Sequence, residues 1–197
     1  MSGNALVAAP PREVLVVVTR RIGDVLLATP LVRSLRAAWP DTEIDALVFA
    51  GTEGVLAANP DIRRVLTVPE RPTLKQHFAL LRSVHRRYAL ALSLVPGDRP
   101  TLYAFVAGRR RAGLLVPGKK NAWKQRLLQA WAPFDDLNTH TVRMHLALAD
   151  LLGVPRIAEV AVTWHAQDEA QLDAMLARAG DRPIAALHAY PKYRYKM

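Results

Sequence analysis

One acidic side chain, Asp24, stands where an apolar run gives way to an amphipathic one. The segment VLVVVTRRIGDVLLATPLVRSL (residues 14–35) starts with β-branched residues, breaks at Arg20 and Arg21, and turns amphipathic after Gly23 and Asp24. Ligands of open α/β sheets bind in the crevice at the carboxyl ends of the strands, where a carboxylate can accept a proton from a bound hydroxyl. Asp is also among the best helix N-caps. The residue types leave both roles for Asp24 open.

The neighbours of Asp24 favour a role in ligand binding. Gly23 allows the backbone to approach a ligand closely. A helix dipole together with Arg20 or Arg21 favours the charged form of the carboxylate. The loop contains neither G-x-G-x-x-G nor G-x-x-x-x-G-K-[ST], and the chain has no G-x-S-x-G. The sequence therefore supports neither a dinucleotide dehydrogenase, nor a P-loop NTPase, nor a serine hydrolase.

Clusters of basic residues could seat an anionic substrate. The chain has 27 Lys and Arg against 17 Asp and Glu, a formal net charge of +10, which favours anionic partners. Each cluster alone could be a solvated face. Together they are expected to form one basic rim on the same side of the sheet as Asp24, suited to a substrate that bears several phosphates. The residues assigned to this rim are Arg20, Arg21, Arg63, Arg64, Lys119, Lys120 and, at a helix start facing the crevice, His140.

Metal and cofactor chemistry is not indicated. The chain has no cysteine, and His140 and His145 are five residues apart, which turns them to different sides of a helix. We therefore predict no metal site and no cofactor. There is no signal peptide pattern and no apolar run of about 18 residues, so the expectation is a cytoplasmic protein that touches a membrane from its surface.

The elements that must position these residues alternate between strand and helix. Repeated β-α-β units with short connections predict an α/β fold, a Rossmann-like doubly wound parallel sheet. Residues 119–139 show no regular pattern. Strands are expected at residues 14–19, 43–49, 64–68, 89–95 and 110–115, and helices at residues 23–39, 52–58, 73–87, 101–108, 140–152 and 167–179.

Two helices carry more detailed expectations. In the first, Pro30 should either bend the helix or, with Thr29 as N-cap, begin a second one. In the helix of residues 73–87, the apolar spacing should turn one stripe toward the core. That stripe consists of Leu74, Phe78, Leu81 and Val84.

The last residues suggest the start of a second domain. A further strand is expected at residues 183–188, followed by a loop rich in Lys, Arg and Tyr. A single strand cannot satisfy its own backbone groups, so it should open another sheet. The expected organisation is one domain over residues 1–165, then an interdomain helix and the truncated start of a second domain over residues 166–197.

Three stretches resemble one known family. VLVVVTRRIGDVLLATPLVRSLRAAWP is similar to the opening of glycosyltransferase family nine, the ADP-heptose:lipopolysaccharide heptosyltransferases, with its strand, Gly-Asp loop and apolar-Pro helix. THTVRMHLALADLLGV resembles the family's His-led helix. AALHAYPKYRYKM resembles the strand and lysine-bearing loop that open its donor half.

The resemblance implies the N-terminal half of a GT-B enzyme, with two Rossmann-like domains and the active site between them. It makes residues 1–165 the acceptor-binding domain, with the basic rim as the acceptor-binding residues, and residues 166–197 the interdomain helix and truncated start of the donor-binding domain. It places the family's general base on Asp24 and a donor-phosphate contact on Lys196, with Gly23 also on the donor side. The implied reaction is an inverting transfer of heptose from ADP-heptose to a phosphorylated glycolipid, the lipopolysaccharide inner core, without a metal. The resemblance also implies that the protein works at the inner membrane surface.

Alternative functions remain at this point. The same fold could transfer another nucleotide sugar to a surface polysaccharide. It could also be a non-catalytic domain that binds an anionic ligand, with Asp24 as a helix cap. A nucleic-acid-binding module is suggested by charge alone; the basic residues lack interleaved aromatics, so no nucleic-acid partner is predicted.

Overall fold

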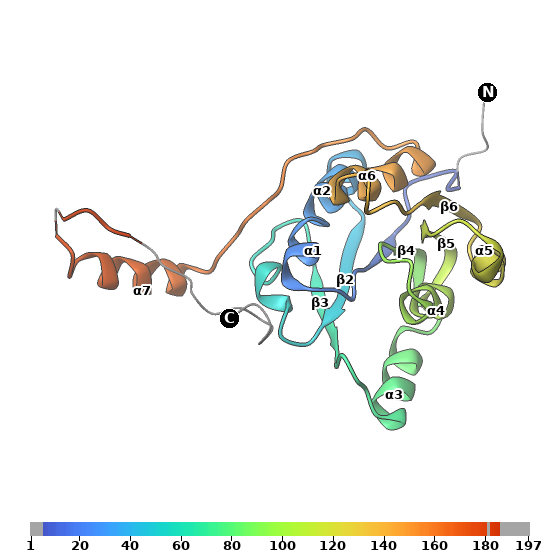
Figure 1. The fold of residues 1–197 in the computed structure, drawn as a ribbon, viewed down its shortest axis with the longest axis horizontal. Helices are drawn as coiled ribbons and strands as arrows, with labels where there is room; N and C mark the ends of the chain where they lie inside the picture. The colour runs from blue at the N-terminus through green and yellow to red at the C-terminus, as the bar shows by residue number, and fades with distance from the viewer. Residues whose placement is uncertain (1–5, 181, 186–197) are drawn as a thin grey trace. The chain divides into compact units, whose positions relative to one another are not determined.

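The computed structural model describes residues 6–180 and 182–185, and residues 6–163 form a parallel sheet covered by helices on both faces (Figure 1). Its six strands lie in the order β3-β2-β1-β4-β5-β6, and every neighbouring pair is parallel. The α/β, Rossmann-like doubly wound fold is therefore confirmed. The strands are β1 (Glu13–Val17), β2 (Glu43–Phe49), β3 (Arg64–Val68), β4 (Tyr88–Ser93), β5 (Gly108–Leu115) and β6 (Ala130–Pro133).

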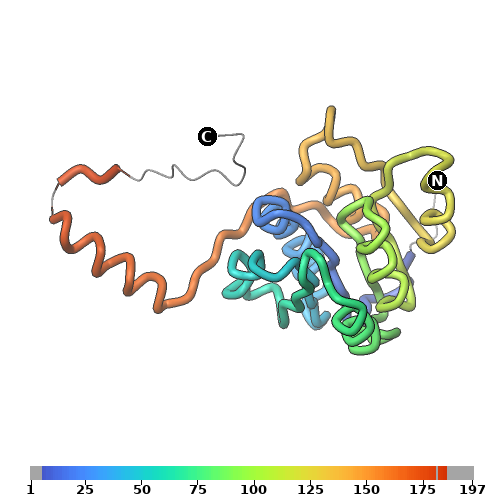
Figure 2. The backbone as a smooth tube through the Cα atoms, turned by 60° about the horizontal axis from the view of Figure 1, so that its bottom comes forward, coloured from blue at the N-terminus to red at the C-terminus, as the bar shows by residue number. Residues whose placement is uncertain are grey.

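The helices of residues 6–163 lie in two layers. The first layer holds α1, α2 and α6, and the second holds α3, α4 and α5. In Figure 2 the blue turn of α1 lies beside the cyan-to-teal segment that contains residues 53–55, which it contacts. The helices are α1 (Ile22–Leu26), α2 (Thr29–Ala38), α3 (Leu74–Val84), α4 (Asp98–Ala107), α5 (Ala122–Leu127), α6 (Thr141–Leu152) and α7 (Ala166–Leu176), with 3-10 turns η1 (Glu53–Val55) and η2 (Lys119–Asn121).

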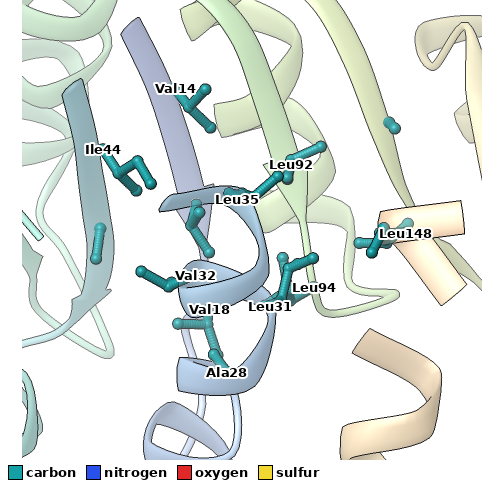
Figure 3. Close-up of a cluster of buried hydrophobic side chains, with 14 of the residues drawn as sticks. Val14, Val18, Ala28, Leu31, Val32, Leu35, Ile44, Leu92, Leu94 and Leu148 are labelled. Carbon is teal, nitrogen blue, oxygen red and sulfur yellow. The ribbon is translucent and has the colours of Figure 1, made fainter. Parts of the chain in front are cut away.

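The central strands are buried on both faces, which explains their continuous apolar sequence. In β1, Val14 and Val16 pack toward α2 and α6, and Leu15 and Val17 pack toward α3 and α4. Figure 3 shows the first of these clusters, where Leu31 and Leu35 of α2 lie beside strand residues such as Leu92. Because all strands are parallel, their starts form one edge of the sheet, here called the amino edge, and their ends form the carboxyl edge.

The first helix is broken, as Pro30 predicted. It ends at Leu26, and α2 restarts with Ala28 as N-cap and Pro30 as its second residue. The expected N-cap, Thr29, is instead the first residue of α2. The Thr29 hydroxyl donates to the Leu26 carbonyl at 2.8 Å and accepts from the amide of Ala161 at 3.0 Å. The break therefore leaves α1 as a short separate helix directly after β1.

Three expectations are wrong in detail. In α3, Leu74 is 89% exposed and Phe78 is 68% exposed, and only the last two residues of the expected stripe, Leu81 and Val84, pack inward. Residues 119–139, for which no pattern was found, contain η2, α5 and the edge strand β6. The expected helix of residues 52–58 is only the single turn η1.

The chain divides into two compact units, residues 1–163 and 164–197. The second unit contains α7, and residues 183–185 are not in a strand; the rest of the expected strand lies outside the described residues. The assignment of this unit to a donor-binding domain stays a prediction. Within residues 6–180 and 182–185, no helix is long and apolar enough to cross a membrane.

Candidate functional site

A pocket of about 180 Å³ opens at the carboxyl edge of the sheet, where β1, β4 and β6 end. Asp24 lies in its wall, together with residues that follow each of these strands. Polar and charged groups contribute most of the lining. The lining residues are Val18, Arg20, Arg21, Asp24, Leu94, Val95, Phe134, Asp136, Thr141 and His145.

Asp24 reaches this pocket because only residues 18–21 separate the end of β1 from the start of α1. The N-cap of α1 is Arg21, whose side chain makes no capping hydrogen bond, and Asp24 lies in the first turn of the helix. The alternative in which Asp24 is the N-cap is therefore not the arrangement observed. The carboxylate is half-buried, and its position at the start of a helix is electrostatically favourable.

His145 forms the floor of the same pocket and comes from α6 on the first helical layer. Its side chain is only 2% exposed, and Nδ1 lies 3.0 Å from the carbonyl oxygen of Leu27. Burial lowers the pKa of His145, and the carbonyls of Leu27 and Leu94 and the nearby Asp24 carboxylate oppose this only in part. His145 therefore ties α6 to the break between α1 and α2, beside Asp24.

The opposite wall comes from the connection between β6 and α6. It contributes Phe134, Asp136 and Thr141. The guanidinium of Arg20 lies 5.9 Å from the centroid of the Phe134 ring, close enough for a cation–π contact. These residues were missed because β6 was not predicted. The short apolar run AWAP at residues 130–133 is the only sequence signal for β6, and it is too short to identify a strand by periodicity.

The other residues assigned to the site have mixed positions. Lys119 and Lys120 are exposed in η2, beyond the end of β5, and so belong to the carboxyl edge with Asp24. His140 is the N-cap of α6, and its Nδ1 accepts from the amide of Val142 at 3.3 Å; it is exposed and does not line the pocket, although Thr141 does. Gly23 is exposed, and a Cβ built on it would meet nothing within 4 Å. Lys196 lies outside the described residues.

Arg63 and Arg64 do not share the rim with Asp24, so that expectation is wrong. They lie at the start of β3, on the amino edge, whereas Asp24 follows the end of β1. Both bind the fully buried carboxylate of Asp45: Arg63 Nη2 lies 2.7 Å and Arg64 Nη2 lies 2.6 Å from Oδ2. Arg63 also pairs with Glu13 and Glu43. These ion pairs could not be predicted from the sequence, because it does not show that the acids and arginines meet at one sheet edge.

The carboxylate of Asp45 is held in its charged form. Burial would raise its pKa, but the hydrogen bonds from Arg63, Arg64 and the Tyr88 hydroxyl outweigh burial and lower it. Tyr88 Oη donates to Asp45 Oδ2 at 2.7 Å, and burial followed by this hydrogen bond raises the pKa of Tyr88. This cluster therefore joins the starts of β2, β3 and β4 and has a structural role.

Among the residues placed by the structure, no group of three or more His, Asp or Glu side chains is arranged to hold a metal ion. The pocket does bring a half-buried carboxylate, a buried imidazole and two arginines to one carboxyl edge. Such a site can bind an anionic ligand and accept a proton from a hydroxyl held beside Asp24.

The arrangement is that of a doubly wound α/β domain with a ligand pocket at the carboxyl edge of its parallel sheet and a carboxylate in the helix that follows the first strand. No protein-family profile matches the chain. The "Lipopolysaccharide heptosyltransferase 3" of Escherichia coli (strain K12) is 25% identical over 140 residues, which are 67% of this chain and 40% of that protein. A protein of the same name from Escherichia coli is 37% identical over 49 residues, 25% of this chain and 14% of that one. The chain thus spans less than half the length of these relatives.

Solved structures show the same fold. The glycosyl transferase family 9 protein from Veillonella parvula DSM 2008 has a TM-score of 0.74 and 18% identity, over 86% of this chain and 49% of that one. ADP-heptose heptosyltransferase II from E. coli has a TM-score of 0.63 and 20% identity, over 87% of this chain and 52% of that one. E. coli WaaC, solved with ADP-2-deoxy-2-fluoro heptose, has a TM-score of 0.62 and 18% identity, over 73% of this chain and 49% of that one. The resemblance to glycosyltransferase family nine, the heptosyltransferases, is therefore confirmed.

Proposed function

We propose that this chain is the acceptor-binding half of an inverting heptosyltransferase that takes heptose from ADP-heptose. The observation that carries the proposal is the position of Asp24, half-buried in a pocket at the carboxyl edge, in a chain similar to heptosyltransferases. The relatives are about twice as long as this chain or longer, so the remaining half would supply the donor site.

In this proposal Asp24 is the general base. An acceptor hydroxyl hydrogen-bonds to the carboxylate and loses its proton as its oxygen bonds to the anomeric carbon, while the bond from that carbon to the ADP phosphate breaks. The proton goes to Asp24 and the electron pair of the broken bond leaves with ADP. Attack from the face opposite the leaving group inverts the anomeric configuration. Positioned bases of this kind contribute roughly 10²- to 10⁴-fold in rate.

The acceptor would be a phosphorylated glycolipid of the lipopolysaccharide inner core. Arg20 and Arg21 in the pocket wall, and Lys119 and Lys120 beyond β5 on the same edge, are suited to its anionic groups. A role for His140 would be indirect, because its imidazole caps α6. Gly23 and Lys196 would contact the donor. The protein would act in the cytoplasm, at the inner membrane surface.

The test uses a full-length protein that contains this chain, purified and mixed with an inner-core acceptor and a panel of nucleotide sugars. ADP-heptose is expected to give acceptor-dependent release of ADP. Release from another nucleotide sugar alone would replace the donor assignment. Binding of acceptor without release of any nucleotide would identify a non-catalytic anion-binding protein instead.

A further inference from the structure

Helix α3 exposes two large apolar side chains that the fold does not use. Leu74 is 89% exposed and Phe78 is 68% exposed. The helix packs through its other side, where Val84 is buried, Leu80 and Leu81 are partly buried, and the His77 ring lies edge-on to Tyr103 at 5.4 Å between centroids. Leu74 and Phe78 are therefore not residual core residues; they lie on a surface without a partner within the described chain.

Basic side chains adjoin these apolar ones on the same side of the helix. At 3.6 residues per turn, Leu74, Phe78 and Arg82 follow one stripe, because they are spaced four apart, and Lys75 lies beside it. We call Leu74, Lys75, Phe78 and Arg82 the α3 surface. Neither Lys75 nor Arg82 has an ion pair with any residue whose placement is described.

The segment around the α3 surface is strongly cationic. Residues 69–87 contain one acid, Glu70, and five basic residues, which are Arg71, Lys75, Arg82, Arg86 and Arg87. There is no acid within α3 itself. A helix with exposed Leu and Phe, flanked by Lys and Arg, has the character of an interfacial helix that lies on an anionic bilayer.

The position of α3 favours an anionic bilayer over a folded protein as its binding partner. Its first residue follows the end of β3 by a short connection, so Leu74 and Phe78 belong to the half of the helix nearest the carboxyl edge, where the pocket opens. The helix lies at the periphery of the domain next to α4 (Figure 1). A convex, single helix offers little area to a folded partner, but it can insert two side chains between lipid headgroups.

We propose that the α3 surface docks this protein on anionic phospholipid, with Leu74 and Phe78 inserted and the surrounding cations on the headgroup phosphates. This orientation turns the carboxyl edge toward the lipid, where a lipid-borne acceptor would be. The inference rests on the proposed function for the lipid-borne acceptor. A single short helix binds reversibly, so the protein would sample the surface rather than stay anchored to it.

The first test is co-sedimentation of the full chain with vesicles. Binding is expected to vesicles of phosphatidylcholine with 30% phosphatidylglycerol at low salt, and to fall steeply with added NaCl or with phosphatidylcholine alone. Replacing Leu74 and Phe78 by Ser should lower the partition coefficient more than tenfold, and K75Q or R82Q about fivefold each. Folding should be retained, because all four side chains are exposed.

Matched controls separate docking through α3 from general attraction. Leu172 is 52% exposed in α7, and Arg110 is an exposed arginine at the amino edge. L172S and R110Q should leave vesicle binding near that of the unmodified chain. Equal losses from control and α3 variants, or no binding to anionic vesicles at low salt, would overturn the proposal.

A second readout locates the inserted side chains. Because the chain has no cysteine, Phe78→Cys carries a single environment-sensitive dye. Anionic vesicles should shift its emission to the blue, whereas dye at Ser83→Cys, an exposed position about 140° around the same helix from residue 78, should not respond. An unchanged spectrum at residue 78 on bound protein would refute insertion. Neither assay needs donor or acceptor, so vesicle docking without sugar transfer would refute only the proposed function.

Discussion

At the scale of single residues, the pocket brings together a half-buried carboxyl group and a buried imidazole. Asp24 enters from α1 and His145 from α6, and the buried imidazole is held against the carbonyl of Leu27 at the break between α1 and α2. The same contact fixes the end of the short helix that carries Asp24. His145 therefore supports the position of Asp24 without needing to touch a substrate.

His145 should make stability depend on pH in a defined window. Its pKa is lowered from 6.5 by burial, so the unfolded chain binds a proton at a higher pH than the folded one. Its contribution is fully present above pH 6.5 and declines as the pH falls toward the folded-state value, by up to about 1.4 kcal/mol per pH unit. Denaturant titrations from pH 7.5 to 5 should show this slope.

His145→Gln provides the comparison for that measurement. The variant should be less stable at pH 7.5 and should lose the part of the slope below pH 6.5 that His145 causes. Parallel stability curves for the two proteins would show that His145 titrates alike in both states, contrary to its buried position.

At the scale of elements, the two edges of the sheet have different tasks. The carboxyl edge carries the pocket, and the amino edge carries the Asp45 cluster, which joins β2, β3 and β4. Arg63 and Arg64 belong to the structural cluster at the amino edge, although their charge and their place near a loop suggested a role in ligand binding at the carboxyl edge.

Asp45→Ala should destabilise the fold strongly. It removes the acceptor of three side chains and leaves the Tyr88 hydroxyl buried without its partner, so we expect a loss of about 3–5 kcal/mol in the free energy of unfolding. Asp41→Ala, at an exposed acid, is the control and should change it by less than about 0.5 kcal/mol. A small effect at Asp45 would mean that water replaces the cluster at little cost.

The sequence predicts the strands of this fold better than its sites. The continuous apolar run of β1 and the exact bounds of β2 and β3 follow from side-chain pattern, and Gly153, which closes α6 with a φ of 68°, follows from turn chemistry. Leu74 and Phe78 have a helical apolar spacing but lie outside the packed side of α3. The apolar pattern predicts that residues 73–87 form a helix, but packing against the neighbouring α4 determines which part of its apolar stripe is covered.

Sites were harder to predict because they join distant segments. Asp24 could be recognised from its place after a strand, but Phe134, Asp136 and His145 come to it only through β6 and α6. Arg63 was assigned to the wrong edge for the same reason, because its partners Asp45 and Glu13 lie in two other strands.

At the scale of the whole molecule, the chain comprises one large unit with a complete sheet and a smaller unit from residue 164 onward. The pocket lies wholly within the first unit. A transferase of this type would need donor contacts from a second domain, and the chain covers about half of the structures it resembles.

The 197-residue chain alone is therefore expected to fold and to bind an inner-core acceptor, but not to release ADP from ADP-heptose. Bringing donor and acceptor together commonly supplies ~7–11 kcal/mol of barrier lowering, which an acceptor domain alone cannot provide. Calorimetric acceptor binding and a coupled ADP assay check both halves of this expectation. Turnover by the isolated chain at a rate near that of a full-length protein would show that the division into acceptor and donor halves is wrong.

The most direct test of the account is the rate of sugar transfer after Asp24→Asn, measured in a full-length protein that contains this chain. If Asp24 is the base, kcat should fall at least about 100-fold, while the unfolding free energy changes by less than about 1 kcal/mol because the side chain is half-buried and does not cap α1. Asp41→Asn should retain near-normal kcat. Transfer by Asp24→Asn at a rate close to that of the unmodified enzyme would contradict the account.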